Sequence, residues 1–124
     1  KGDDLAKIFQ IKEIKFDLGK YNIRPDAAAE LAKIVEAMKD HPTMKISIRS
    51  HTDSRGSDKS NLILSDKRAK STMEWIASQG IAKNRMTAKG YGETQLVNHC
   101  KNGVRCTEEE HQQNRRSEFI ITQM

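Results

Sequence analysis

Hydrophobic and polar residues alternate along two short stretches of the chain with the period of half-buried β-strands. In residues 44–51, Met44, Ile46 and Ile48 are separated by polar residues, and residues 11–18 show the same alternation. Two further stretches near the C-terminal half have strand-like composition. We therefore predict four strands, over residues 11–18, 44–51, 86–92 and 115–123.

Two longer segments place their apolar residues on one face of an α-helix. The first begins at Pro25, a residue favoured at helix starts, and ends before His41 and Pro42. The second has Ser57 as a candidate N-cap and Gly80 as a left-handed stop. The expected inward residues are Ala28, Leu31, Ala32, Val35 and Met38 within residues 24–40, and Ala69, Thr72, Met73 and Ile76 within residues 57–80.

The predicted elements follow one another in the order β-α-β-α-β-loop-β. A strand-helix-strand crossover is normally parallel and right-handed, so the order implies a mixed sheet with both helices on one face. We therefore expect a two-layer α/β (α+β) sandwich, with a four-stranded mixed sheet covered by two long helices. The 124 residues suit one domain, 1–124, with its core over about 11–122.

Composition narrows the class of protein. An apolar fraction of 35% and a charged fraction of 31% are typical of a soluble domain, and no apolar run is long enough for a membrane-spanning helix. The net charge of +5 is spread along the chain without a nucleic-acid-binding motif, so we expect no nucleic-acid partner. The start, "KGDDLAKIFQ", carries neither an initiating Met nor a signal sequence, which favours the C-terminal part of a longer protein.

The stretch "HTDSRGSDKSNLILSDKRA" places polar side chains where a strand gives way to a helix. Asp53 follows the strand, and Arg68 lies about three turns into the helix, on the same face as Asn61, Ser65 and Thr72. A carboxylate and a guanidinium at the carboxyl end of a strand suit a zwitterion, such as an amino acid with both groups free. Alternatively, Asp53 and Arg68 bond each other or the backbone and only brace the loop.

This stretch, together with "AKGYGE" and "NRRSEF", strongly resembles the OmpA-like family of bacterial cell-wall anchoring domains, from about Phe16 to Ile121. The resemblance implies the fold predicted above and non-covalent binding of peptidoglycan without catalysis. It further implies that Asp53 and Arg68 hold the diaminopimelate residue of the stem peptide, and that no cofactor is needed. The other ligand-binding residues that the resemblance implicates are Thr52, Asn61 and Leu64, together with Phe16 and Asp17.

Four residues in or near the motifs are candidates for loop support. We expect His51 to fix the turn through backbone hydrogen bonds, the alternatives being a ligand contact or a catalytic dyad with Asp53. Asn114, Arg115 and Arg116 either tie the last loop to the binding loop or form a solvated charge cluster. The chain departs from many family members in having Ser50 before the histidine and a longer, cysteine-bearing segment before the last strand.

Cys100 and Cys106 enclose five residues in that polar segment, a span that a disulfide can bridge. An exported domain meets an oxidising compartment, where close cysteines usually pair, so we predict a disulfide and no metal. The alternatives are a zinc site completed by His99 and His111, and two reduced thiols.

The resemblance leads us to expect a periplasmic module that ties an outer-membrane or periplasmic protein to the cell wall. Any membrane attachment would come from an upstream region of the parent protein. One alternative is the same module in the stator of an ion-driven motor. A cell-wall hydrolase using His51 and Asp53 is a further alternative, but the sequence offers it no convincing nucleophile or zinc triad. We therefore predict that the domain is not an enzyme.

Overall fold

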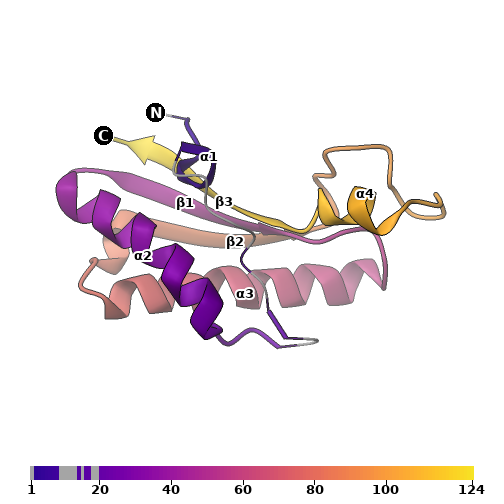
Figure 1. Ribbon diagram of the computed structural model, residues 1–124, viewed down its shortest axis with the longest axis horizontal. Helices are drawn as coiled ribbons and strands as arrows, with labels where there is room; N and C mark the ends of the chain where they lie inside the picture. The colour runs from indigo at the N-terminus through magenta and orange to yellow at the C-terminus, as the bar shows by residue number, and fades with distance from the viewer. Residues whose placement is uncertain (1, 9–13, 15, 18–19) are drawn as a thin grey trace.

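A mixed three-stranded sheet forms the centre of the computed structural model, which describes residues 2–8, 14, 16–17 and 20–124 (Figure 1). The central strand β1 (Lys45–His51) pairs in parallel with β2 (Met86–Gly92) and antiparallel with β3 (Arg116–Gln123). In this register Ile48 lies opposite Ala88 on one side and Phe119 on the other. Three of the four predicted strands are therefore present, with bounds within one residue of those expected.

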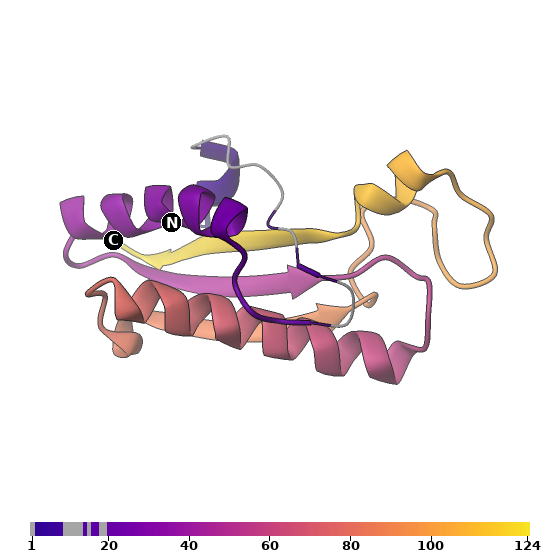
Figure 2. The ribbon, with the colours of Figure 1, turned by 60° about the horizontal axis from the view of Figure 1, so that its bottom comes forward.

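Two long helices, α2 (Pro25–Asp40) and α3 (Asp58–Ser78), lie on the same side of the sheet (Figure 2). The Ser57 hydroxyl accepts a hydrogen bond from the Ser60 backbone N–H, as expected of an N-cap. The prediction of which α2 residues face inward was partly wrong, because the buried face of the helix is turned relative to the expected one. Ala27 and Ile34 are buried, whereas Ala28 is half-buried and Ala32 is exposed.

Within the residues that it describes, the structure adds two short helices and one 3-10 turn that the apolar pattern did not indicate. An isolated turn of helix has too few residues to show a 3.6-residue period. These elements are α1 (Leu5–Ile8), the 3-10 turn η1 (Lys83–Arg85) and α4 (Glu108–Gln112). Among the described residues, no helix is both long enough and apolar enough to cross a membrane.

The predicted first strand is not seen in the described part of the chain. Ile14, Phe16 and Asp17 belong to no strand, and the rest of 11–18 lies outside the described residues. Instead, the N-terminal residues 2–4 lie beside β3, where the Gly2 N–H donates to the Ile121 carbonyl at 2.6 Å. Alternation predicts which side chains are buried, and Ile14 is indeed in the core, but burial does not require pairing with a neighbouring strand.

Close contact between α3 and β2 fixes the helix that carries the predicted site. A Cβ on Gly90 would lie 2.0 Å from the Asp66 backbone nitrogen, so only glycine allows this approach. The Asp66 carboxylate accepts from the Gly90 N–H at 3.1 Å, and the buried Ser65 hydroxyl accepts from the Gly92 N–H at 2.9 Å. α3 is therefore locked in register with the sheet along the half of its length that includes Asn61 and Arg68.

Candidate functional site

The candidate site lies where the parallel strands β1 and β2 end and α3 begins. The loop from Thr52 to Ser57 starts beside β2, because the Thr52 N–H donates to the Gly92 carbonyl at 2.8 Å. Asn61, one turn into α3, donates to the backbone carbonyl of Arg55 at 2.9 Å and to that of Asp53 at 3.5 Å. The loop is thus held against both the sheet and the helix, at the strand ends where open α/β sheets bind ligands.

Asp53 is buried and fully engaged in this loop. Its Oδ1 accepts from the Arg55 backbone N–H at 2.9 Å, while Oδ2 accepts from the Arg55 guanidinium at 2.9 Å and from the Arg115 guanidinium at 2.6 Å. Burial alone would raise the pKa of the Asp53 carboxyl, but the hydrogen bonds from Arg55 and Arg115 outweigh it and lower the pKa to about 2. Asp53 therefore stays ionised at any physiological pH.

Glu108 completes this arrangement from the first turn of α4. Its Oε1 lies 2.6 Å from Arg115 Nη2, and its Oε2 lies 3.0 Å from Arg55 Nη1. We call Asp53, Arg55, Arg115 and Glu108 the Asp53 network. Two carboxylates and two guanidiniums balance in charge, so neither buried oxygen of Asp53 depends on solvent for compensation.

Sequence reasoning placed Arg115 in loop support and missed Arg55 and Glu108. The Arg115 guanidinium donates to Asp53, so a contact links the start of the last strand to the Asp53 loop. Arg55 stands two residues after Asp53 in the motif, and this spacing could have indicated that the two residues bond each other. Glu108 belongs to a run of three glutamates that gave no reason to choose one of them.

Arg68 is held by a different part of the chain. It donates from Nε to the Lys20 carbonyl at 3.0 Å and from Nη2 to the Asp17 carbonyl at 3.4 Å. Its guanidinium carbon lies 4.8 Å from the centre of the Phe16 ring, a cation–π contact. The structure thus brings Phe16, Asp17 and Arg68 together, as one group of the expected site residues.

The expected site residues therefore form two groups beside one face of α3, one around Asp53 and one around Arg68. Asn61, which contacts the Asp53 loop, precedes Arg68 by seven residues, which is about 10 Å along a helix axis. The half-buried Leu64 lies between them on that face. Both groups bond the protein itself, as the bracing alternative expected, and a ligand would have to exchange for some of these contacts.

Thr52 and Glu93 add polar groups at the strand ends. The Thr52 hydroxyl donates to the Asp53 carbonyl at 3.0 Å, which places it in the loop but turns it toward the backbone. Burial, with a hydrogen bond to Asp58, raises the pKa of the Glu93 carboxyl to about 7. Glu93 follows β2 directly, so one carboxyl group near Asp53 changes its charge around neutral pH.

The expectation for His51 was wrong in its partner. The buried ring places Nε2 2.7 Å from Glu118 Oε1 and stacks on Tyr91 at 5.3 Å between ring centres. Glu118 is within reach of His51 because β1 and β3 are neighbouring strands. This hydrogen bond joins two side chains, so it is neither the expected bond to the backbone nor a dyad with Asp53. Burial lowers the pKa of His51, which favours its neutral form.

Asn114 supports the long segment before β3 and not the Asp53 loop itself. It is fully buried, its Oδ1 accepts from the Val97 N–H at 2.7 Å, and its Nδ2 donates to Asn98 Oδ1 at 2.9 Å. Arg116 donates to the Gln95 carbonyl at 2.9 Å. These hydrogen bonds of Asn114 lie within the segment before β3, whereas the expectation was a tie to the binding loop.

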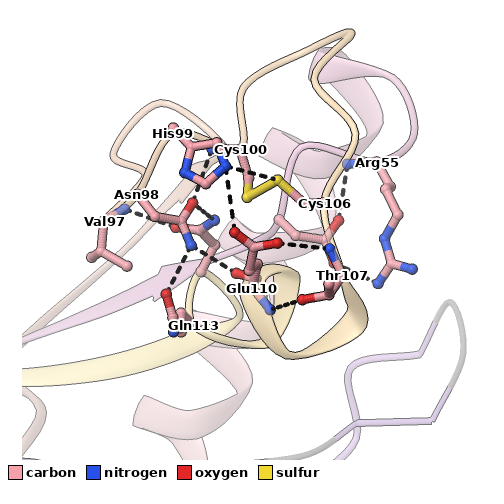
Figure 3. The surroundings of a disulfide bond; sticks show 11 residues. Arg55, Val97, Asn98, His99, Cys100, Cys106, Thr107, Glu110 and Gln113 are labelled. Carbon is pink, nitrogen blue, oxygen red and sulfur yellow. Dashed lines mark hydrogen bonds and ion pairs between the residues drawn. A yellow bond between two sulfur atoms is a disulfide. The ribbon is translucent and has the colours of Figure 1, made fainter.

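The disulfide predicted between Cys100 and Cys106 is present, with its Cα atoms 6.0 Å apart (Figure 3). The Asn102 side chain of the enclosed loop donates to Asp58 at the start of α3, at 3.1 Å. Thr107 and Glu110 then form a capping box that begins α4. The cysteine loop is therefore connected to the Asp53 network through α4, which carries Glu108.

Comparison with known proteins identifies the family. Residues 15–110 match the model of the OmpA family. Over 87 residues the chain is 38% identical to "Peptidoglycan-associated lipoprotein" of Brucella melitensis biotype 1, covering 70% of this chain and 52% of that protein. Over 94 residues it is 31% identical to "Outer membrane porin F" of Pseudomonas fluorescens, covering 75% of this chain and 29% of that protein.

The fold agrees with that match. The solved structure of the peptidoglycan-associated lipoprotein from Burkholderia pseudomallei superposes with a TM-score of 0.72 at 27% identity, covering 89% of this chain and 87% of that one. The chain spans about half or less of the length of the curated relatives it matches. With the family model matched over most of its length, the chain belongs to the OmpA family.

Proposed function

We propose that this domain binds peptidoglycan non-covalently, through the diaminopimelate residue of the stem peptide, and so anchors a larger protein to the cell wall. The observation that carries the proposal is the buried carboxylate of Asp53, ionised at neutral pH, at the strand ends beside the face of α3 that carries Asn61 and Arg68. The free end of diaminopimelate carries an ammonium and a carboxylate group, which require one acceptor and one bidentate donor.

Binding of the ammonium group at Asp53 requires one cation to replace another. Asp53 Oδ2 is shared by Arg55, whose side chain is 52% exposed, and Arg115, whose side chain is 27% exposed. The more exposed Arg55 can move into solvent at little cost, whereas Arg115 stays held between Asp53 and Glu108. The exchange leaves no buried charge unpaired, so it avoids the main penalty of opening an ion pair.

The ligand carboxylate pairs with Arg68 in the proposal. Arg68 currently donates to two neutral carbonyls, one of them at a long 3.4 Å, and a carboxylate is a stronger acceptor than either. The ammonium and carboxylate groups of the ligand share one carbon atom, so the Arg68 side chain has to turn from the Lys20 and Asp17 carbonyls toward Asp53 for both pairs to form. Leu64 offers apolar surface on the same face for the methylene chain of diaminopimelate, and Thr52 and Asn61 hold the loop.

The names of the relatives support the same role and its location. A peptidoglycan-associated lipoprotein and an outer-membrane porin both belong to the bacterial cell envelope. We infer a periplasmic domain that reaches the outer membrane only through its parent protein, and that catalyses no reaction. The proposal concerns the module, so it holds equally for an outer-membrane parent and for the stator of an ion-driven motor.

The direct test is binding to purified sacculi by the isolated domain. Asp53→Asn keeps the shape of the side chain but removes its charge, and a hydrogen bond to a charged group contributes roughly 1.5–3 kcal/mol, so affinity should fall about ten- to a hundredfold. Asp40→Asn, at the exposed end of α2, is the matched control and should bind as the wild type does. Equal sedimentation of both variants with sacculi would refute the assignment of Asp53.

A further inference from the structure

Four potential metal ligands converge beside the disulfide (Figure 3). They are His99, Cys100, Cys106 and Glu110, and one ligand atom from each lies within 4.8 Å of all the others. His99 Nε2 is 3.8 Å from Cys106 Sγ and 3.4 Å from Glu110 Oε2. His111, which the sequence suggested as the fourth ligand, is not in this group, and a carboxylate takes its place.

The two distances from His99 match those of a tetrahedral zinc site, while the two sulfur atoms would have to separate on reduction. Zinc binds sulfur at about 2.3 Å and imidazole or carboxylate at about 2.0–2.2 Å, so neighbouring ligand atoms of a tetrahedron lie about 3.3–3.8 Å apart. The distances from His99 Nε2 to the Cys106 sulfur and to the Glu110 oxygen already have this size. A ligand set of two thiolates, an imidazole and a carboxylate also binds zinc in preference to magnesium or calcium.

Hydrogen bonds, in addition to the disulfide, hold two of the four ligands in place. The Thr107 N–H donates to Glu110 Oε1 at 3.0 Å, which leaves Oε2 on the side of His99. Asn98 links the two halves of the loop, because its Nδ2 donates to the Glu110 carbonyl at 2.8 Å and its Oδ1 accepts from the Cys100 N–H at 3.0 Å. Glu110 and Cys100 therefore have partners other than the sulfur–sulfur bond.

We propose that the cysteine loop is a redox-gated zinc site, closed to metal as the disulfide and able to bind one zinc ion through His99, Cys100, Cys106 and Glu110 once it is reduced. A dithiol donor supplies the two electrons and two protons that convert the disulfide to two thiols, and is itself oxidised to a disulfide. Zinc then displaces both thiol protons. The exposed Lys101 and Arg105 of the same loop offset the net negative charge of the zinc–thiolate complex.

Zinc would preserve the start of α4 when the disulfide is lost. Glu110 caps α4, and Glu108 of the same helix pairs with Arg55 and Arg115. A ligand bond to Glu110 would keep this turn ordered in a reducing environment. The inference rests on the loop geometry alone and does not depend on the proposed function.

The test uses tag-free protein, reduced with a phosphine and titrated with zinc chloride against a competing chelator, with stoichiometry read by native mass spectrometry. We expect one zinc per reduced chain and none on the oxidised chain. His99→Ala and Glu110→Gln should each weaken zinc binding by more than about tenfold, the low end of what loss of even an outer-sphere partner costs. Glutamine still serves in a capping box, so Glu110→Gln leaves α4 in place.

The matched controls are His41→Ala and Glu109→Gln, which remove an exposed histidine and an exposed glutamate outside the ligand group. Both should bind zinc as the wild type does. Absence of zinc on the reduced wild type would overturn the proposal. Wild-type affinity in both His99→Ala and Glu110→Gln would equally overturn it, because the two thiols alone would then account for the binding.

Discussion

Acid should destabilise this protein through Asp53 in a way that a single substitution can isolate. The pKa of Asp53 is about 2 in the folded state, against an ordinary value of 3.8, because the hydrogen bonds from Arg55 and Arg115 outweigh burial. A carboxyl group whose pKa is lowered by folding stabilises the fold at pH values above its unfolded pKa. That stabilisation is lost as the pH falls through the folded pKa.

The size of the effect follows from the shift. Lowering the pKa from 3.8 to about 2 corresponds to about 2 kcal/mol of unfolding free energy at neutral pH. The Asp53 side chain is only 8% exposed, so solvent screening reduces this figure little. About half of the contribution should be lost by pH 3, and nearly all of it below pH 2.

Urea unfolding of the wild type and of Asp53→Asn at pH 7, 4 and 3 measures this contribution. We expect Asp53→Asn to be less stable than the wild type at pH 7, and the gap to narrow by about 1 kcal/mol at pH 3. Asp40→Asn, the exposed control, should follow the wild type at every pH. A gap between the wild type and Asp53→Asn that stays constant from pH 7 to pH 3 would refute the ion-pair account of Asp53.

Two further substitutions test the packing of the site. Gly90→Ala should lower the unfolding free energy by about 3 kcal/mol, because its Cβ would overlap the Asp66 backbone nitrogen, and an unchanged melting temperature would show that α3 does not pack this closely. Replacing Cys100 and Cys106 by serine should cost about 2 kcal/mol, since the closed loop is short, but should leave most of the affinity for diaminopimelate peptides. A large loss of affinity in this double variant would show that the cysteine loop helps to form the site.

The sequence predicted the elements whose ends carry their own chemical signals. Ser57 caps α3 through its own side chain, and Gly80 takes the positive φ that stops it, so both bounds could be predicted from local residues. β1 and β3 were predicted from their apolar residues. The alternation in residues 11–18 correctly predicted that Ile14 is buried. It did not predict that residues 2–4 would lie beside β3.

The ion pairs of the site could not be predicted in the same way. Asp53 and Arg115 are separated by 62 residues, and their contact depends on where α4 places the start of β3. The partner of His51 depends likewise on the register between β1 and β3. Sequence motifs therefore suggested candidate residues for the site, but not which of them bond one another.

The central claim is tested most directly by calorimetry of the isolated domain with two stem peptides that differ only in carrying diaminopimelate or lysine. Lysine keeps the ammonium group for Asp53 but lacks the carboxylate for Arg68, so the wild type should prefer diaminopimelate by about ten- to a hundredfold. Arg68→Ala should lose this preference, while Lys67→Ala, one residue earlier on α3, should keep it. Equal binding of the two peptides by the wild type, or a preference that survives in Arg68→Ala, would contradict the account.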